Sequence, residues 1–438
     1  MVQARVHALK LRARLAAGLL GLACLLAPLL APLLAIQSAM GATIPVAPEA
    51  GALAGALARA RDGDTLVLAP GTHQGPVSID RTVTVTGQAG TVVDGGGHGR
   101  VITVAAPNAT LRGVTVINSG DKLSTEDSGI FVTAAADGAI IENNRLEENL
   151  IGIYLKGPEN ARVRGNTIIG RRDLRMNERG NGVQLWNTPG SVIEGNDIRF
   201  GRDGIFVTTS RNNVFRKNRL QDLRFAIHYM YTNDSEVSGN VSRRNHSGYA
   251  IMFSNALQIR GNLSEGDRDR GLLLNYANNS NITGNVIRNG PEKCVFIYNA
   301  NMNRIDGNRF EGCDIGIHFT AGSARNRIAN NAFIGSRTQV KYVGTRHVEW
   351  SADGRGNYWS DNTAFDLDGD GIADRPYHPN DLVDQIVWRH PLAKMLLNSP
   401  ALQVLRWSQS EFPALHPGGV TDSAPLMSAP ENPINEES

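Results

Sequence analysis

The chain has 438 residues, 41% of them hydrophobic and 20% charged, and it carries a formal net charge of +2. This composition excludes intrinsically disordered and fibrous proteins, and the length allows a large buried core. Aromatic residues make up only 6% of the chain while glycine reaches 47 residues, a balance typical of many short strands joined by tight turns.

Residues 1–41 have the features of a cleaved secretory signal peptide. Four basic residues precede an uncharged apolar run over residues 15–35, and the small residues at 39–41 offer a cleavage site. A retained anchor helix is the alternative, because about 20 apolar residues span a bilayer, but Pro28 and Pro32 favour cleavage. A lipoprotein is disfavoured, because the apolar run continues well past Cys24.

Removal of this segment changes the formal net charge from +2 to −2, because it contains four basic residues and no acidic residue. The exported chain would then lack the basic surface of a nucleic-acid-binding protein, so we expect no nucleic-acid partner. No second apolar stretch reaches the length of a membrane span. We therefore expect an exported, soluble body.

Residues 63–117 contain several short strand-like segments without a clean repeat. The segment GDTLVLAPGTH, which begins at Gly63, resembles the first coil of the pectate-lyase-like superfamily and of carbohydrate-binding and sugar-hydrolase-like repeat domains. That resemblance implies a β-helix that starts close to the end of the signal peptide.

A regular repeat follows, in which an asparagine recurs with steps of 22, 30, 22, 22, 22, 23, 23 and 23 residues. The nine positions are Asn144, Asn166, Asn196, Asn218, Asn240, Asn262, Asn285, Asn308 and Asn331. Each unit holds three short strand-like phrases, which is the pattern of one β-helix coil and not of a helical solenoid. We therefore predict an all-β fold, a right-handed parallel β-helix over residues 42–355, with a loop in place of the eight extra residues near 171–180.

The asparagines are expected to have a structural role. Coils stack about 4.8 Å apart, so identical amides can hydrogen-bond along the axis, and asparagine tolerates a left-handed backbone. The second phrase of each unit alternates between inward aliphatic residues and an outward residue. The predicted outward row is Tyr154, Gln184, Phe206, His228, Met252, Leu273, Phe296 and His318.

This outward row is largely apolar, and such a surface indicates either a partner-binding site or a sheet covered by another part of the chain. From the row we take Tyr154, Phe206, Leu273, Phe296 and His318 as candidate partner-surface residues. The row contains no arginine, lysine or carboxylate. Polyuronate lyases and epimerases need cations to neutralise the sugar carboxylate and a base to remove the C5 proton, and hydrolases need carboxylates as acid and base. The sequence thus argues against an enzyme.

His228, Met230 and Met252 form a candidate copper(I) site. The interpretation places His228 and Met252 side by side in adjacent coils and Met230 at the start of the following turn. Imidazole and thioether groups are soft ligands that select copper(I) over hard cations. The alternative is ordinary packing of surface histidine and methionine.

Two cysteines follow residue 41, Cys294 and Cys313. They lie about four residues out of register between neighbouring coils, so the sequence leaves open whether they form a disulfide, bind a metal or do neither.

The repeat stops near Gly356, and residues 356–416 are a separate C-terminal segment. Its carboxylates Asp366, Asp368, Asp370 and Asp374 occupy positions 1, 3, 5 and 9 of an EF-hand-like loop, with glycine at position 6. Tyr377 stands where a bidentate glutamate would complete a calcium shell. The loop is therefore a candidate calcium site or an acidic turn without an ion.

Two amphipathic helices are predicted over about 381–397 and 401–412, separated at Pro400. They carry Trp388 and Trp407 with leucines at helical spacing, and they either cap the open end of the β-helix or dock a partner. Residues 417–438, rich in proline and serine, are predicted to be a flexible tail.

The C-terminal segment carries a specific family resemblance. The phrases GNYWSD from Gly356, DLDGDGIADRPYHPNDLVD from Asp366 and WRHPLAKMLLNSPALQVLRW from Trp388 resemble the NosD family of periplasmic maturation factors of nitrous oxide reductase. The repeats agree with that family but are not specific to it.

The resemblance implies a periplasmic, non-enzymatic protein. It implies work with the membrane subunit and ATPase of an ABC transporter, with a copper chaperone and with nitrous oxide reductase, in assembling the copper centre by delivery of copper or sulfur. The alternative from another class is an exported polysaccharide lyase or C5-epimerase of the β-helix superfamily.

Overall fold

The computed structural model describes residues 41–438 apart from residues 321, 345, 398, 413–417, 432–433 and 435–438. The predicted signal peptide lies almost wholly outside these described residues. Among the helices that are described, none has both the length and the apolar character needed to cross a membrane.

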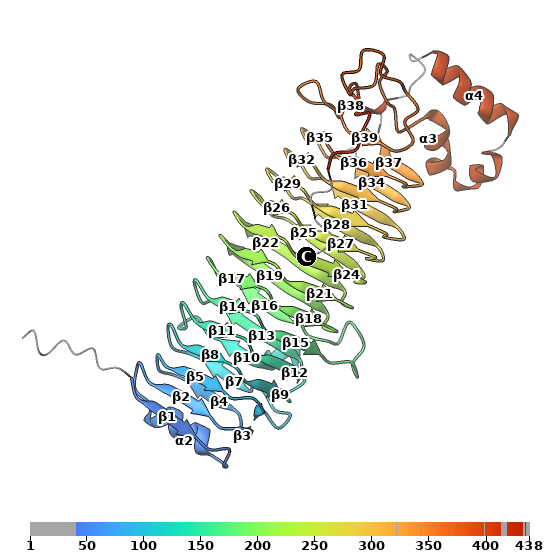
Figure 1. Cartoon of the computed structure of the whole chain (residues 1–438). Coiled ribbons are helices and arrows are strands. Elements are labelled where there is room, and N and C mark those ends of the chain that lie inside the picture. The colour runs from blue at the N-terminus through green and yellow to red at the C-terminus, as the bar shows by residue number, and fades with distance from the viewer. Residues whose placement is uncertain are drawn as a thin grey trace, which may run out of the picture. The chain divides into compact units, whose positions relative to one another are not determined.

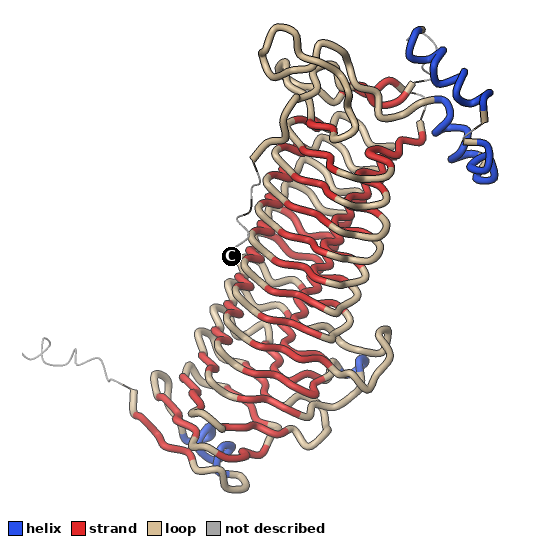
Figure 2. Tube along the Cα trace, turned by 45° about the vertical axis from the view of Figure 1, so that its right-hand side comes forward, coloured by secondary structure: helices blue, strands red, loops and turns tan. Residues whose placement is uncertain are grey.

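The predicted right-handed parallel β-helix is confirmed, and its coils stack along one axis (Figures 1 and 2). Three parallel sheets, here sheets I, II and III, run along it. Sheet I contains β1 (Thr43–Val46), β2 (Thr65–Leu68), β5 (Thr84–Gly87), β8 (Thr110–Arg112), β11 (Ile140–Glu142), β14 (Arg162–Arg164), β17 (Val192–Glu194), β20 (Val214–Arg216), β23 (Glu236–Ser238), β26 (Gln258–Arg260), β29 (Asn281–Thr283), β32 (Arg304–Asp306) and β35 (Arg327–Ala329).

Sheet II contains β4 (Val77–Ile79), β7 (Ile102–Val104), β10 (Ser128–Val132), β13 (Ile151–Lys156), β16 (Val183–Trp186), β19 (Asp203–Arg211), β22 (Phe225–Asn233), β25 (Ser247–Met252), β28 (Arg270–Asn275), β31 (Lys293–Tyr298), β34 (Ile315–Thr320) and β37 (Thr338–Val343). Sheet III contains β3 (Gly71–Gln74), β6 (Thr91–Asp94), β9 (Thr115–Ile117), β12 (Arg145–Asn149), β15 (Thr167–Gly170), β18 (Asp197–Arg199), β21 (Arg219–Gln221), β24 (Val241–Arg243), β27 (Leu263–Glu265), β30 (Val286–Arg288), β33 (Arg309–Glu311), β36 (Ala332–Ile334) and β39 (Tyr358–Trp359).

The nine predicted asparagines form a continuous buried ladder. In a typical step, Oδ1 of Asn240 accepts the backbone N–H of Asn218 at 3.0 Å and its side-chain amide at 2.9 Å, and the Asn218 amide also donates to the carbonyl of Ile193. The long step is bridged in the same way, with Asn166 donating to Asn196 at 3.0 Å. The extra residues 171–180 therefore leave the coil as a loop between β15 and β16, as predicted.

One part of the ladder interpretation is wrong. The ladder asparagines do not adopt the left-handed backbone; the residue before each of them does, as at Gly195, Lys217 and Gly239. Asparagine is needed at the ladder position for its amide, which can donate and accept along the axis at once.

Both ends of the β-helix are covered. Helix α2 (Ala52–Arg59) buries Leu53, Ala56 and Leu57 against the first coils. At the other end the buried Trp350 and Trp359 lie over Phe333, and Trp359 stacks on it at 4.3 Å. This aromatic layer closes the apolar core, so that strand edges are not left open.

The prediction of a flexible tail is wrong for residues 418–431. Strand β40 (Gly419–Thr421) pairs with β38 (His347–Glu349), and Leu426 forms bridges to Tyr358 and Ile372. Asp422 is fully buried and accepts hydrogen bonds from the Asn357 backbone and from the Trp359 indole, each at 2.7 Å. Since Asn357 is a tenth ladder asparagine, the tail supplies the acceptor that ends the ladder.

The predicted C-terminal helices are present as α3 (Leu382–Arg389) and α4 (Pro400–Glu411), with the 3₁₀ helix η2 (Pro391–Leu396) between them. Asp381 and Ser399 cap the two α-helices. The first helix is shorter than predicted, because Pro391 has no N–H to continue the α-helical pattern. A further short 3₁₀ helix, η1 (Leu123–Thr125), lies before β10.

We predict that buried Asp267 makes stability depend on pH. Asp267 accepts hydrogen bonds from Ser242, Ser264 and the Asn245 backbone, but burial raises its pKa from 3.8 to about 6. The unfolded carboxyl titrates near its ordinary value, so this residue favours folding below pH 4 and that contribution is lost as the pH rises to 6.

The matched variant is Asp267→Asn, which keeps the shape and does not titrate. Urea unfolding of both proteins should show that wild type loses about 2 kcal/mol relative to the variant between pH 4 and pH 7. The contributions of all other titrating groups to the free energy of unfolding cancel when the two proteins are compared. A difference between them that stays constant across this range would contradict the prediction.

Candidate functional site

The outer face of sheet II carries the predicted outward row, with one correction. His228 pairs with Ala250 across β22 and β25, and Ala250 pairs with Leu273, so Ala250 belongs to the row in place of Met252. With Met252 in the row, the inward residue before it would be Ile251, but the structure pairs Ile227 with Tyr249, which lies inside the coil. Its hydroxyl oxygen lies 2.8 Å from the carbonyl oxygens of both Asn240 and Leu263, to either of which it can donate. The 22-residue step from Ile227 already indicated Tyr249.

The predicted copper residues nevertheless gather on this face. Met230 pairs directly with Met252 in the next coil, at the separation of about 4.8 Å that parallel strands impose. Met230 lies within β22 rather than in the following turn, two residues beyond His228 and therefore on the same face. The adjacent-coil pair is thus formed by the two methionines, and His228 lies diagonally beside them.

His228 is held by contacts that sequence reasoning missed. Its Nδ1 lies 3.0 Å from Oδ2 of Asp203, and Arg224 donates to both oxygens of the same carboxylate at 2.8 and 2.7 Å. The imidazole also packs against Phe206 and Phe225, with ring centroids 5.0 and 4.9 Å away. Burial alone would raise the pKa of Asp203, but the hydrogen bonds from His228 and Arg224 lower it below its ordinary value.

Asp203 belongs to a second row that the sequence argument overlooked. In this row Asp203 pairs with Phe225, and further along Arg270 pairs with Lys293. Both cations contact Asp269. The eight predicted row residues carry no charge, but the row continues from His318 to Lys341, and the neighbouring row is charged. The argument against an enzyme is therefore weaker than the sequence suggested.

The candidate partner-surface residues are less exposed than predicted. Tyr154 and Leu273 are buried, with 5% and 6% of their surface exposed, while Phe206, Phe296 and His318 are intermediate. Burial, together with nearby Lys341, Lys293 and Arg270, lowers the pKa of His318 to about 4.

The more exposed apolar side chains lie at the edge of sheet II, where the strands turn away. Tyr231 and Tyr276 are 54% and 42% exposed, and Phe253 stacks between them with centroid distances of 5.2 and 5.1 Å. This aromatic edge follows directly after Met230 and Met252 along the chain. Sequence reasoning missed it because these residues adopt a left-handed backbone, Tyr231 within β22 and Phe253 and Tyr276 just after β25 and β28, which interrupts the strand alternation.

The C-terminal helices present a second apolar surface. Val383 and Val387 of α3 are buried, but Leu392, Met395 and Trp407 are 83%, 85% and 62% exposed. Trp388 is of intermediate exposure. The fully buried apolar residues of these helices thus lie on α3, while Leu392 and Met395 of η2 and Trp407 of α4 are exposed.

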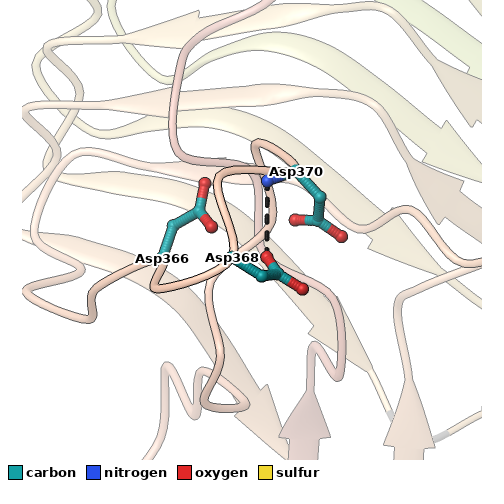
Figure 3. Close-up of side chains that lie close together, drawn as sticks. All are labelled: Asp366, Asp368 and Asp370. Atoms are coloured by element: carbon teal, nitrogen blue, oxygen red, sulfur yellow. Dashed lines mark hydrogen bonds between the residues drawn. The ribbon is translucent and has the colours of Figure 1, made fainter.

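Three of the four predicted calcium residues lie together. Single carboxylate oxygens of Asp366, Asp368 and Asp370 come within 4.8 Å of one another, and Figure 3 shows the three side chains around the turn. Both Asp366 oxygens accept backbone N–H groups of the loop, and Asp374 accepts the Leu367 N–H at 2.8 Å. The loop is thus stabilised by its own backbone, and calcium binding stays a prediction.

Cys294 and Cys313 form a disulfide with a Cα–Cα distance of 5.6 Å. Both are buried. Neither side chain is therefore a free thiolate for metal binding.

Comparisons with known proteins give the family of the chain. The family described as "Periplasmic copper-binding protein (NosD)" matches residues 164–364, and "Right handed beta helix region" matches residues 77–198. The chain is 42% identical to "Probable ABC transporter binding protein NosD" of Pseudomonas aeruginosa, over 84% of this chain and 90% of that protein. It is 40% identical to the protein so named from Stutzerimonas stutzeri, over 84% and 88%.

Among solved structures, alginate lyase AlyF-OU02 aligns with a TM-score of 0.49 and 12% identity, over 73% of this chain and 88% of the lyase. The mannuronan C-5 epimerase AlgE6 A-module of Azotobacter vinelandii aligns with a TM-score of 0.43 and 15% identity, over 68% and 83%. The relatives, in contrast, match at high identity over nearly their whole length, and the chain therefore belongs to the NosD family.

Proposed function

We propose that this protein is a periplasmic accessory factor that carries copper(I) during maturation of nitrous oxide reductase. In this proposal a copper chaperone delivers the ion, an ABC transporter membrane subunit with its ATPase is the docking partner, and the reductase is the recipient. The observation that supports it most strongly is the gathering of His228, Met230 and Met252 on one outer face in a member of a family described as copper-binding.

The donor set fits copper(I) as a cargo. Thioether sulfur and neutral imidazole are soft donors, and no hard carboxylate is needed among them. Three donors on an open sheet face leave one side of the ion accessible, which suits transfer between proteins better than storage. A sulfur cargo is the other possibility for this family, and it would need no such donors.

The apolar surface of η2 and α4 supports a docking role. A large, strongly exposed apolar set on a soluble segment usually marks an interaction site. Because the relatives are named as ABC transporter binding proteins, we propose that Leu392, Met395 and Trp407 contact the transporter. The row on sheet II and the aromatic edge would then be free for the chaperone or the reductase.

A polysaccharide lyase or C5-epimerase is the second candidate function. One observation favours it: Asp203, Arg224 and His228 bring a carboxylate, a cation and an imidazole together on one face. The bidentate Arg224–Asp203 pair already satisfies that cation, however, which leaves it poorly placed to neutralise a sugar carboxylate. Turnover of alginate or polygalacturonate by the purified protein would favour the enzyme.

Copper(I) titration tests the cargo proposal. We predict that the double variant His228→Ala/Met252→Leu binds copper(I) more than about 100-fold more weakly than wild type, since changes to partners outside the ligand set alone typically cost about 10–100-fold. Competition with a chromophoric copper(I) chelator gives the affinities. His318→Ala, from the same outward row, is the control and should bind like wild type. Equal affinity of the wild type and the double variant would show that these residues do not bind copper(I).

Substitution of the exposed helical residues tests the docking proposal. We predict that Leu392→Gln/Met395→Gln/Trp407→Gln leaves the thermal midpoint within about 2 °C of wild type, because surface changes rarely alter stability by more than ~0.5 kcal/mol. Co-purification with the detergent-solubilised transporter should be lost. The aromatic-edge variant Tyr231→Gln is the control and should still co-purify. Retention of the transporter by the triple variant would contradict the proposal.

A further inference from the structure

His228 and His318 lie in the same outward row of sheet II, but their ring nitrogens have different partners. Nδ1 of His228 is 3.0 Å from the carboxylate of Asp203, whereas Nδ1 of His318 is buried without a hydrogen-bond partner. Only His228 is adjacent to the methionine pair, through Met230. The histidine next to the two methionines, His228, is thus the one whose Nδ1 contacts a carboxylate.

Asp203 is well suited to orient a ring. It is fully buried, and its backbone N–H donates to Oδ1 of Asn181 at 3.3 Å. Arg224 donates to both of its oxygens, so the carboxylate is fixed and paired with a permanent positive charge. Asp203 lies in the coil before that of His228. Its position relative to the imidazole therefore depends on the stacking of β19 and β22.

The chemistry of this contact decides where the imidazole proton lies. An ionised carboxylate can only accept a hydrogen bond, so the Nδ1 of His228 must donate. A neutral His228 then carries its proton on Nδ1, and Nε2 keeps a lone pair. Phe206 and Phe225 restrict the ring on its flanks. Metal-binding histidines usually donate their second ring N–H to a carboxylate or carbonyl in this way.

We propose that Asp203 is a positioning residue for copper(I), which fixes the tautomer and orientation of His228 so that Nε2 is presented to the ion beside Met230 and Met252. The inference rests on the proposed function. Arg224 contributes by neutralising the buried carboxylate and holding it in place, without contact to the ion.

The variant Asp203→Asn tests the proposal with little change in volume. Oδ2 of Asp203 accepts from both Arg224 and His228, whereas Oδ1 accepts from Arg224 alone. An amide N–H₂ at the Oδ2 position faces Nδ1 of His228 and selects the opposite tautomer, with the proton on Nε2; in the other orientation the N–H₂ opposes the Nε–H of Arg224. The variant therefore raises the share of the Nε2 tautomer, as expected when an amide replaces an orienting carboxylate. Glu194→Gln is the matched control, because it removes a similar cross-coil contact, Arg216–Glu194 at 2.9 Å, where no histidine is bound.

Two readouts are needed. In ¹⁵N-histidine-labelled protein without copper, the ring signals of His228, assigned by their loss in His228→Ala, should show the proton on Nδ1 in wild type and an increased share on Nε2 in Asp203→Asn. Copper(I) affinity, measured by chelator competition, should fall about 10–100-fold in Asp203→Asn and stay unchanged in Glu194→Gln.

The outcomes separate this inference from the function it rests on. If His228→Ala weakens copper(I) binding but Asp203→Asn does not, Asp203 is not a positioning residue while the copper proposal stands. If His228→Ala binds copper(I) like wild type, both are wrong. Should Asp203→Asn fail to fold, the wild-type spectrum still tests the proposal. A proton on Nε2 of His228 in the wild type would overturn it.

Discussion

From Asn144 to Asn357, each coil of this protein is joined to the next through a buried asparagine amide that hydrogen-bonds to the amide and backbone of its neighbour. An asparagine at this position satisfies polar groups inside the coil that no water reaches, and a buried unsatisfied group would cost about 1–3 kcal/mol. The ladder therefore enforces one register between coils. Every row on the outer faces inherits that register, including the pairing of Met230 with Met252.

The end of the ladder explains why residues 418–426 pack against the β-helix. Asn357 would have no amide above it, and the buried carboxylate of Asp422 supplies the missing acceptor. Burial raises the pKa of Asp422 despite these hydrogen bonds. The aromatic layer of Trp350, Trp359 and Phe333 completes the cover. Residues 418–426 are thus part of the fold, although their composition resembles that of a loose tail.

The repeat in the sequence was sufficient to predict the coils, the loop near 171–180 and the ladder residues, because each depends on spacing alone. It was not sufficient where a coil departs from the common pattern. Tyr249 replaces an aliphatic inward residue, and this shifted the interpretation of Met252 by two positions. Asp203 and Arg224 were missed because an ion pair between coils has no local sequence signature. The tail was missed because its contacts lie 63–65 residues away.

The outer face of sheet II combines features that are separate in the sequence: two thioethers in register, an imidazole backed by a carboxylate, and an aromatic edge beside them. The cysteines offer no alternative thiolate, because they are joined in the core. Sulfur ligation of copper on the chain from residue 41 onward would therefore come from methionine.

X-ray absorption spectroscopy of the copper(I)-loaded protein tests this account most directly. The account predicts a first shell with sulfur from two thioethers and nitrogen from one imidazole, and the imidazole contribution should disappear in His228→Ala. A shell of nitrogen and oxygen only, or one unchanged in His228→Ala, would contradict it.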